Sequence, residues 1–159
     1  MEINDLQIGD VVLTGLCYGY TNVKNNEICE LPLMITEVKD IDKNQALCKV
    51  IDMPETYVDI NDILGIPLNQ YRLRLLGFKQ IDKIHALRPG APNFNGTVYE
   101  AQINGIKIQI IEDNNSYELC RSTSAPTLPI NYVHDMQHNI TVNGKPLKIN
   151  YMIFCPDRK

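Results

Sequence analysis

The sequence lacks any run of about 18 consecutive apolar residues, so no segment is expected to cross a membrane. Its first residues are acidic and contain no apolar core, which argues against a secretory signal and predicts a cytoplasmic protein. The five cysteines include no Cys-x-x-Cys pair, so a thiolate zinc site has no local nucleus. We therefore expect the cysteines to act as small buried apolar residues.

Dense basic segments are also missing. The net charge is −4, from 15 basic and 19 acidic residues, whereas general nucleic-acid binders carry a basic footprint. Arg72-Leu73-Arg74 is the nearest approach to a basic run. The sequence therefore predicts no general DNA binding and leaves room for a local basic pocket.

Catalytic and cofactor motifs are absent as well. The chain contains no Gly-x-Ser-x-Gly elbow, no Gly-x-Gly-x-x-Gly and no P-loop. Cys120 with His134 is an alternative nucleophile and base, because such pairs assemble in space. We expect a protein that is not an enzyme and that needs no cofactor.

What is present suits one α+β domain. The chain has 159 residues, of which 44% are hydrophobic and 21% charged, as in ordinary globular proteins. The elements also allow two lobes, a β-rich lobe over 1–66 and an α+β lobe over 67–159.

Short apolar segments between polar turns predict a small curled antiparallel sheet, SH3-like, in the first lobe. Cys48 and Val50 share one face of a strand there, and Leu47 and Lys49 share the other. Asn61–Gly65 reads as a turn of helix. The expected strands lie within 6–20, 33–38, 45–52 and 57–60.

The second lobe begins with a short helix at about 69–76, for which Asn69 is a plausible N-cap and Gly77 a left-handed C′ residue. A three-strand meander follows over 97–121, with a type I′ turn at Asn104-Gly105. Its alternation predicts that Ile106, Ile108 and Ile110 are buried and that Lys107 and Gln109 face solvent.

An amphipathic helix is expected over 130–142, with Pro129 near its first turn, and a last strand over 147–155. A hairpin of 139–142 with 147–152 across Asn143-Gly144 is the alternative.

Three phrases carry a resemblance to a known family. They are Asp5–Val12, Ile66–Phe78 with its Ile-Pro-Leu-Asn and Leu-Gly-Phe, and Tyr132–Gln137. They resemble a family of small uncharacterised proteins from phages and prophages of gut bacteria. The chain departs from its pattern at Tyr71, where Trp is common, at His138, where Asn is usual, and at Asn143-Gly144, where Thr-Gly is usual. The resemblance implies a bacterial host cell and transfers no catalytic residue.

His134 and His138 lie one turn apart on the predicted helix and would project from one face. This spacing suits two zinc ligands, with Asp135 or Cys120 as a third, but no third ligand is fixed by spacing. The resemblance keeps His134 alone. We therefore predict a structural His134 that is hydrogen-bonded to a neighbouring strand, and no metal site. His134 and His138 are the two residues on which a metal site would be built.

Two proline-containing loops are the better candidates for a binding site. Arginine with small polar side chains suits phosphate or carboxylate, and an aromatic ring suits a base. The expected ligand-binding residues are Arg88, Asn93, Phe94, Asn95, Arg121, Ser122, Thr123 and His134.

Three functions are expected, and the phage context of the first is implied by the family resemblance alone. The first is a non-enzymatic phage-type binding protein that counters host defence by sequestering a small anionic ligand, such as a nucleotide signal. The second is a module whose SH3-like sheet binds a host protein or nucleic acid, and the third a metal hydrolase on His134 and His138. A homo-oligomer is also compatible, with Phe78, Phe94 and tyrosines as candidates for the subunit contact.

Overall fold

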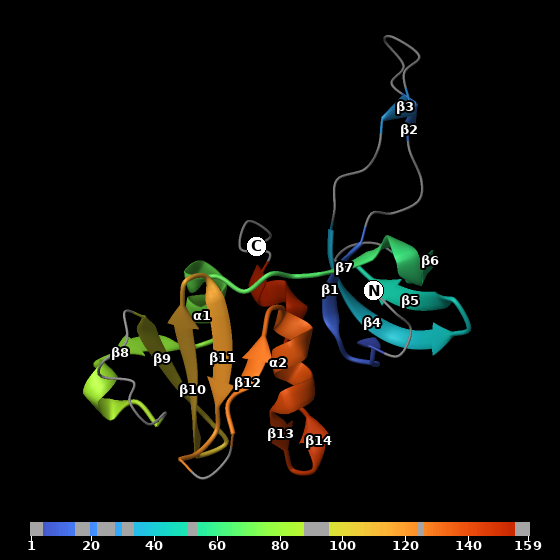
Figure 1. Ribbon diagram of the computed structural model, residues 1–159. Coiled ribbons are helices and arrows are strands. Elements are labelled where there is room, and N and C mark those ends of the chain that lie inside the picture. The colour runs from blue at the N-terminus through green and yellow to red at the C-terminus, as the bar shows by residue number, and fades with distance from the viewer. Residues whose placement is uncertain are drawn as a thin grey trace. The chain divides into compact units, whose positions relative to one another are not determined.

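The computed structural model describes residues 5–14, 20–21, 28–29, 34–50, 54–87, 96–123 and 126–154. The chain divides into two compact units, Met1–Ile66 with Lys148–Lys159, and Pro67–Leu147 (Figure 1). This grouping places residues 148–159 with the first unit. Antiparallel sheets dominate and helices are few, as in an α+β protein. No helix of the described part is long and apolar enough to cross a membrane.

The first unit contains a five-stranded sheet in the order β6-β5-β4-β1-β7, with every neighbouring pair antiparallel. The expected strands at 33–38 and 45–52 are confirmed, although the first is longer and the second shorter. A separate hairpin pairs β2 (Tyr20–Thr21) with β3 (Ile28–Cys29). The bounds of the five strands are Val11–Thr14 for β1, Met34–Asp42 for β4, Gln45–Lys49 for β5, Thr56–Asp59 for β6 and Ile63–Gly65 for β7.

The core of this unit lies on one face of the sheet. Cys48 and Val50 are buried, whereas Leu47 and Lys49 on the other face are half-buried, as the alternation predicted. The cluster consists of Leu6, Val12, Val38, Ala46, Cys48, Val58, Ile60 and Ile63.

The expected helical turn at Asn61–Gly65 is wrong in part. A 3-10 turn, η2, spans Ile60–Asp62, and Ile63–Gly65 then continues as β7. The side chain of Asp59 accepts the Asn61 N–H at 2.9 Å. This cap closes a tight turn, after which the chain pairs with β1 as a strand.

The second unit is built on a five-stranded antiparallel sheet in the order β12-β11-β10-β9-β8. The predicted three-strand meander is confirmed as the centre of this sheet. Asn104 and Gly105 have φ values of 51° and 77°, as a type I′ turn requires. The strands are β8 (Lys79–Ile81), β9 (Thr97–Ile103), β10 (Ile106–Asp113), β11 (Ser116–Cys120) and β12 (Leu128–Ile130).

Gln109 does not face solvent as predicted, because this sheet is covered on both faces. The side chain is fully buried, and its Oε1 accepts the Leu87 N–H at 2.7 Å. Its Nε2 donates to the His85 carbonyl at 2.9 Å and to Glu100 Oε1 at 3.0 Å. The segment after the 3-10 turn η3 (Lys83–His85) therefore lies over this face, where Val98, Ile111 and Cys120 form a second cluster with Ile81, Ala86 and Leu87.

The short helix α1 spans Gln70–Leu75 and is confirmed. The side chain of Asn69 accepts the Arg72 N–H at 2.8 Å, and Gly77 has a left-handed φ of 92°. The Phe78 N–H then donates to the Leu73 carbonyl at 3.0 Å. Phe78 is 1% exposed, so the expectation that it lies at a subunit contact is wrong.

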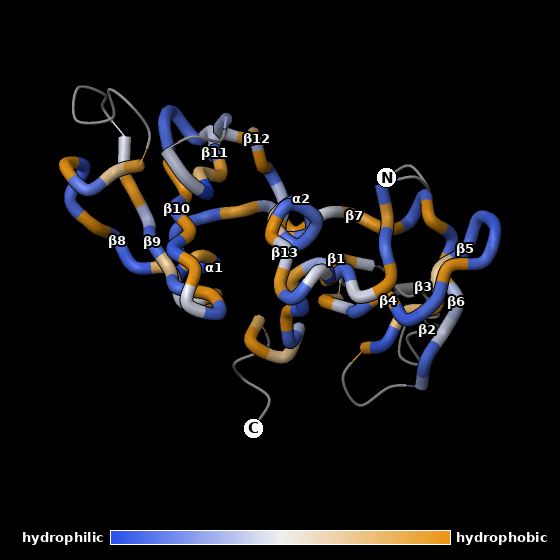
Figure 2. The backbone as a smooth tube through the Cα atoms, turned by 90° about the horizontal axis from the view of Figure 1, so that it is seen from below, coloured by the Kyte–Doolittle hydropathy of each residue, from blue (hydrophilic) through white to orange (hydrophobic). Residues whose placement is uncertain are grey.

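Helix α2 is shorter than predicted and spans Val133–Asn139, with apolar residues on part of its coil in Figure 2. Pro129 lies in β12 instead of the first helical turn. The Asn143-Gly144 turn joins β13 (Thr141–Val142) to β14 (Lys145–Pro146), so the alternative hairpin is right in its turn and wrong in its strand lengths.

The expected last strand over 147–155 is wrong within the described residues. A 3-10 turn, η5, spans Tyr151–Phe154. The side chain of Asn150 accepts the Met152 N–H at 3.1 Å, and this local bond favours a turn over an extended strand. Cys155 lies outside the described residues.

Replacing Gln109 by leucine should lower the free energy of unfolding by about 2–4 kcal/mol, because the Leu87 N–H and the His85 carbonyl lose their partner. Urea denaturation measures this change. Gln102→Leu, at an exposed glutamine of β9, is the matched control and should change stability by less than about 0.5 kcal/mol. Equal losses in the two variants would contradict the buried role of Gln109.

Candidate functional site

A small cleft of about 140 Å³ lies within the Pro67–Leu147 unit. Five of the side chains that line it are aliphatic, one is a threonine and one is an arginine. They are Ile103, Ile106, Ile108, Ile140, Val142, Thr141 and Arg121. As far as the described residues show, the cleft is therefore an apolar hollow with one cation.

One wall comes from the hairpin of β9 and β10. Ile103 and Ile106 are register partners beside the Asn104-Gly105 turn, and Ile108 lies two residues further along the same face. Ile108 is 4% exposed, as predicted, whereas the prediction that Ile106 is buried is wrong, because this residue lies beside the turn at the end of the sheet and is 53% exposed. Ile108 therefore belongs to the deep part of the cleft and Ile106 to its rim.

The opposite wall comes from the segment that follows α2. Ile140 is the C-cap residue of this helix, its N–H donates to the Met136 carbonyl at 3.1 Å, and its side chain is 2% exposed. Thr141 and Val142 continue as β13. The position of this wall thus depends on where α2 ends.

Arg121 supplies the cation. It follows β11 directly and is exposed, and its Nη1 donates to the Asn139 carbonyl at 3.5 Å. Cations are favoured at the C-terminal end of a helix, where carbonyl groups lack helical partners. This single long bond leaves most of the guanidinium N–H groups for a ligand, because a guanidinium donates in several directions.

His134 lies in the first turn of α2, away from the helix end that Arg121 contacts. The side chain is buried, with the residue 5% exposed. Its ring stacks on Tyr132 with a centroid distance of 5.5 Å and an interplanar angle of 9°, and the His138 ring meets it edge-on at 5.6 Å. These contacts make His134 a packing residue of α2.

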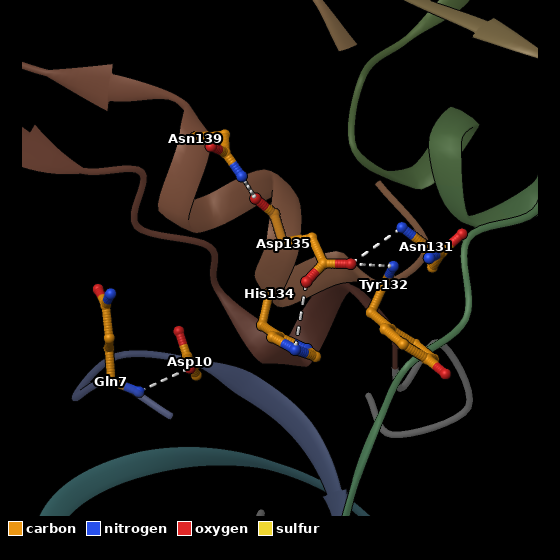
Figure 3. Close-up of polar contacts among 7 residues, drawn as sticks. All are labelled: Gln7, Asp10, Asn131, Tyr132, His134, Asp135 and Asn139. Carbon is orange, nitrogen blue, oxygen red and sulfur yellow. Dashed lines mark hydrogen bonds and ion pairs between the residues drawn. The ribbon is translucent and has the colours of Figure 1, made fainter. Parts of the chain in front are cut away.

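Asp135 organises the start of the same helix (Figure 3). Its Oδ2 accepts the N–H groups of Asn131 at 2.9 Å and Tyr132 at 3.0 Å, and its Oδ1 lies 3.5 Å from His134 Nε2. The Asn139 side chain donates to the Asp135 carbonyl at 2.7 Å. One carboxylate therefore caps the helix and fixes the neighbouring imidazole.

The described residues show no built metal site, and Cys48 is not activated as a nucleophile. No group of three His, Cys, Asp or Glu side chains in that part of the chain is placed to hold a metal ion. Burial raises the pKa of the Cys48 thiol to about 11, and a hydrogen bond with Thr36 lowers it by a smaller amount. Cys48 is therefore a thiol at neutral pH and a poor nucleophile. The Sγ of Cys120 donates to the Ser122 carbonyl at 3.8 Å.

The expected binding residues are only partly placed. Four of them, Arg88, Asn93, Phe94 and Asn95, lie outside the described residues. Arg121 lines the cleft, whereas Ser122, Thr123 and His134 do not. The sequence did not predict the aliphatic walls, because isoleucine and valine carry no polar group that marks a binding site. An isoleucine beside a hairpin turn, Ile106, was the one signal in the sequence.

Comparisons of the chain with protein-family models, with curated proteins and with solved structures found no match.

Replacing His134 by alanine should lower the free energy of unfolding by about 2 kcal/mol, because a buried ring with two aromatic neighbours is removed. Thermal and urea denaturation measure the loss. His85→Ala, at an exposed histidine of the same unit, is the control and should be close to wild type. A His134→Ala variant as stable as wild type would overturn the packing role.

Proposed function

We propose that the chain is a non-enzymatic binding protein that sequesters a small anionic ligand, with Arg121 as its anion contact. The observation that carries this proposal is a guanidinium at the edge of an apolar cleft. Few polar groups in a mostly apolar hollow are the usual make-up of a small-molecule site. The phage or prophage context rests on the family resemblance, and countering host defence by removing a small signal fits that context.

The electrostatics around Arg121 support an anion. Within the described residues Arg121 makes one hydrogen bond, to a neutral carbonyl, and no carboxylate forms an ion pair with it. A carboxylate or phosphate would thus meet an uncompensated charge next to apolar walls. Charge-assisted bonds of this kind are stronger than neutral ones.

Sequestration requires no turnover, and the side chains around the cleft agree with that requirement. The cleft is lined by aliphatic residues, Thr141 and Arg121, and these include no general acid or base and no thiol. We therefore propose that a ligand is held there without turnover.

The alternative function rests on the first unit, for which we infer an SH3-like architecture. Its support is the meander β4-β5-β6, followed by the 3-10 turn η2 and by β7, which pairs back onto β1. Tyr57 on β6 is 46% exposed and Leu64 on β7 is 48% exposed. Exposed apolar side chains on strands suit a protein partner better than a small anion.

A thermal-shift panel of nucleotides, cyclic nucleotides and small carboxylates tests the proposal. At least one anion should raise the melting temperature of the wild type, because a ligand that binds only the native state stabilises it, by about 2.7 kcal/mol at 100 times Kd. Arg121→Ala should abolish the shift. Lys145→Ala, at an exposed lysine outside the cleft, should keep it.

Absence of any shift in the wild type, or equal shifts in the two variants, would contradict sequestration at Arg121. Capture of a host protein by wild type and Arg121→Ala but not by Tyr57→Ala would instead favour the alternative.

A further inference from the structure

We infer that the ligand of this cleft is a small monocarboxylate with a compact apolar body, about the size of a phenyl ring or a branched alkyl group. The inference rests on the proposed function and names its ligand class. The geometry of the cleft favours this class over a nucleotide.

Size is the first argument. The cleft measures about 140 Å³, close to the roughly 150 Å³ apolar cavity that accommodates benzene and well below the roughly 300–1,000 Å³ of typical pockets for larger ligands. A single ring or a short branched chain fills such a volume. A whole nucleotide would leave its sugar and most of its polar atoms outside.

The chemistry of the walls is the second argument. Ile108 and Ile140 are almost completely buried, so the described residues in the deep part of the cleft offer no hydrogen-bonding side chain. Placing a ribose hydroxyl or a base amide there would strip it of water without a partner, which costs free energy. An apolar body enters without that loss, and each buried methylene group favours binding.

The third argument is the charge. Among the described residues that line the cleft, Arg121 is the sole cation, and it is exposed. One guanidinium matches one carboxylate in a two-bond arrangement. A ligand with several negative charges would leave the others without a partner from these residues.

The apolar walls and the exposed guanidinium of Arg121 set the orientation of the ligand. The apolar body lies between the Ile108 and Ile140 side chains, and the carboxylate points outward to Arg121 at the mouth. Ile106 at the rim covers one side of the body.

Isothermal titration calorimetry with benzoate as the probe tests the inference on the full chain. Benzoate should bind at least about tenfold more tightly than benzamide, which has the same body without the charge. Acetate, which has the charge without the body, should also bind at least about tenfold more weakly. Arg121→Gln should remove the preference of benzoate over benzamide, and Lys145→Gln should preserve it.

A second pair of variants tests the apolar wall. Ile106→Ala should weaken benzoate binding by a factor of about two to five, because part of a rim side chain is lost. Ile84→Ala removes an isoleucine that is 68% exposed and does not line the cleft, and it should leave benzoate binding unchanged.

Equal binding of benzoate and benzamide would overturn the inference that the ligand carries a carboxylate. Tighter binding of adenosine monophosphate than of benzoate through Arg121 would overturn the inferred ligand class. In the second outcome sequestration of an anion at Arg121 would still stand. Failure of every anion to bind would remove the proposed function together with the inference.

Discussion

The carboxylate of Asp135 sets the start of α2, and the cleft depends on it. The first N–H groups of a helix lack partners within the helix. Just before α2, the Asp135 side chain accepts hydrogen bonds from the N–H groups of Asn131 and Tyr132, and so fixes the chain at the point where α2 begins. The helix then ends at Asn139, and Ile140 turns toward the hairpin of β9 and β10. A shift of the helix by one residue would rotate Ile140 by about 100° around the helix axis and remove one wall.

The same helix connects three side chains that the sequence suggested as functional. His134 packs in the first turn, Asp135 caps that turn, and Arg121 contacts the last carbonyl. The two histidines are therefore part of how the helix is held. Arg121 is the one of the three that is exposed and lines the cleft, so the proposed binding lies at the end of the helix, whereas the packing contacts of His134 lie at its start.

Local chemistry was predictable wherever a few adjacent residues decide it. Asn104-Gly105 specified a hairpin and Asn69 a helix start, because turn and cap geometry depend on neighbours in the sequence. Gln109 was misplaced because its burial depends on residues 83–87, which cross the sheet from a distant part of the chain. The alternation of apolar and polar residues along a strand cannot show that both faces of its sheet are covered.

Of the candidate site, the sequence predicted Arg121 but not the aliphatic walls. Arg121 follows a strand and precedes a proline-containing linker, and that context marked it as a binding residue. The cleft itself needs the β9–β10 turn, Asn104-Gly105, beside the end of α2 at Asn139, and these positions are 35 residues apart in the sequence (139 − 104). Apolar residues such as Ile140 look alike in a core and in a binding wall, so no pattern separates the two.

A methyl NMR titration of the isoleucines with benzoate tests directly whether the ligand occupies the cleft beside Arg121. If the ligand occupies the cleft beside Arg121, the δ1-methyl signals of Ile106, Ile108 and Ile140 shift together, and those of Ile63 and Ile84 stay in place. Shifts confined to isoleucines outside the cleft, or no shift at a concentration at which calorimetry detects binding, would contradict the account.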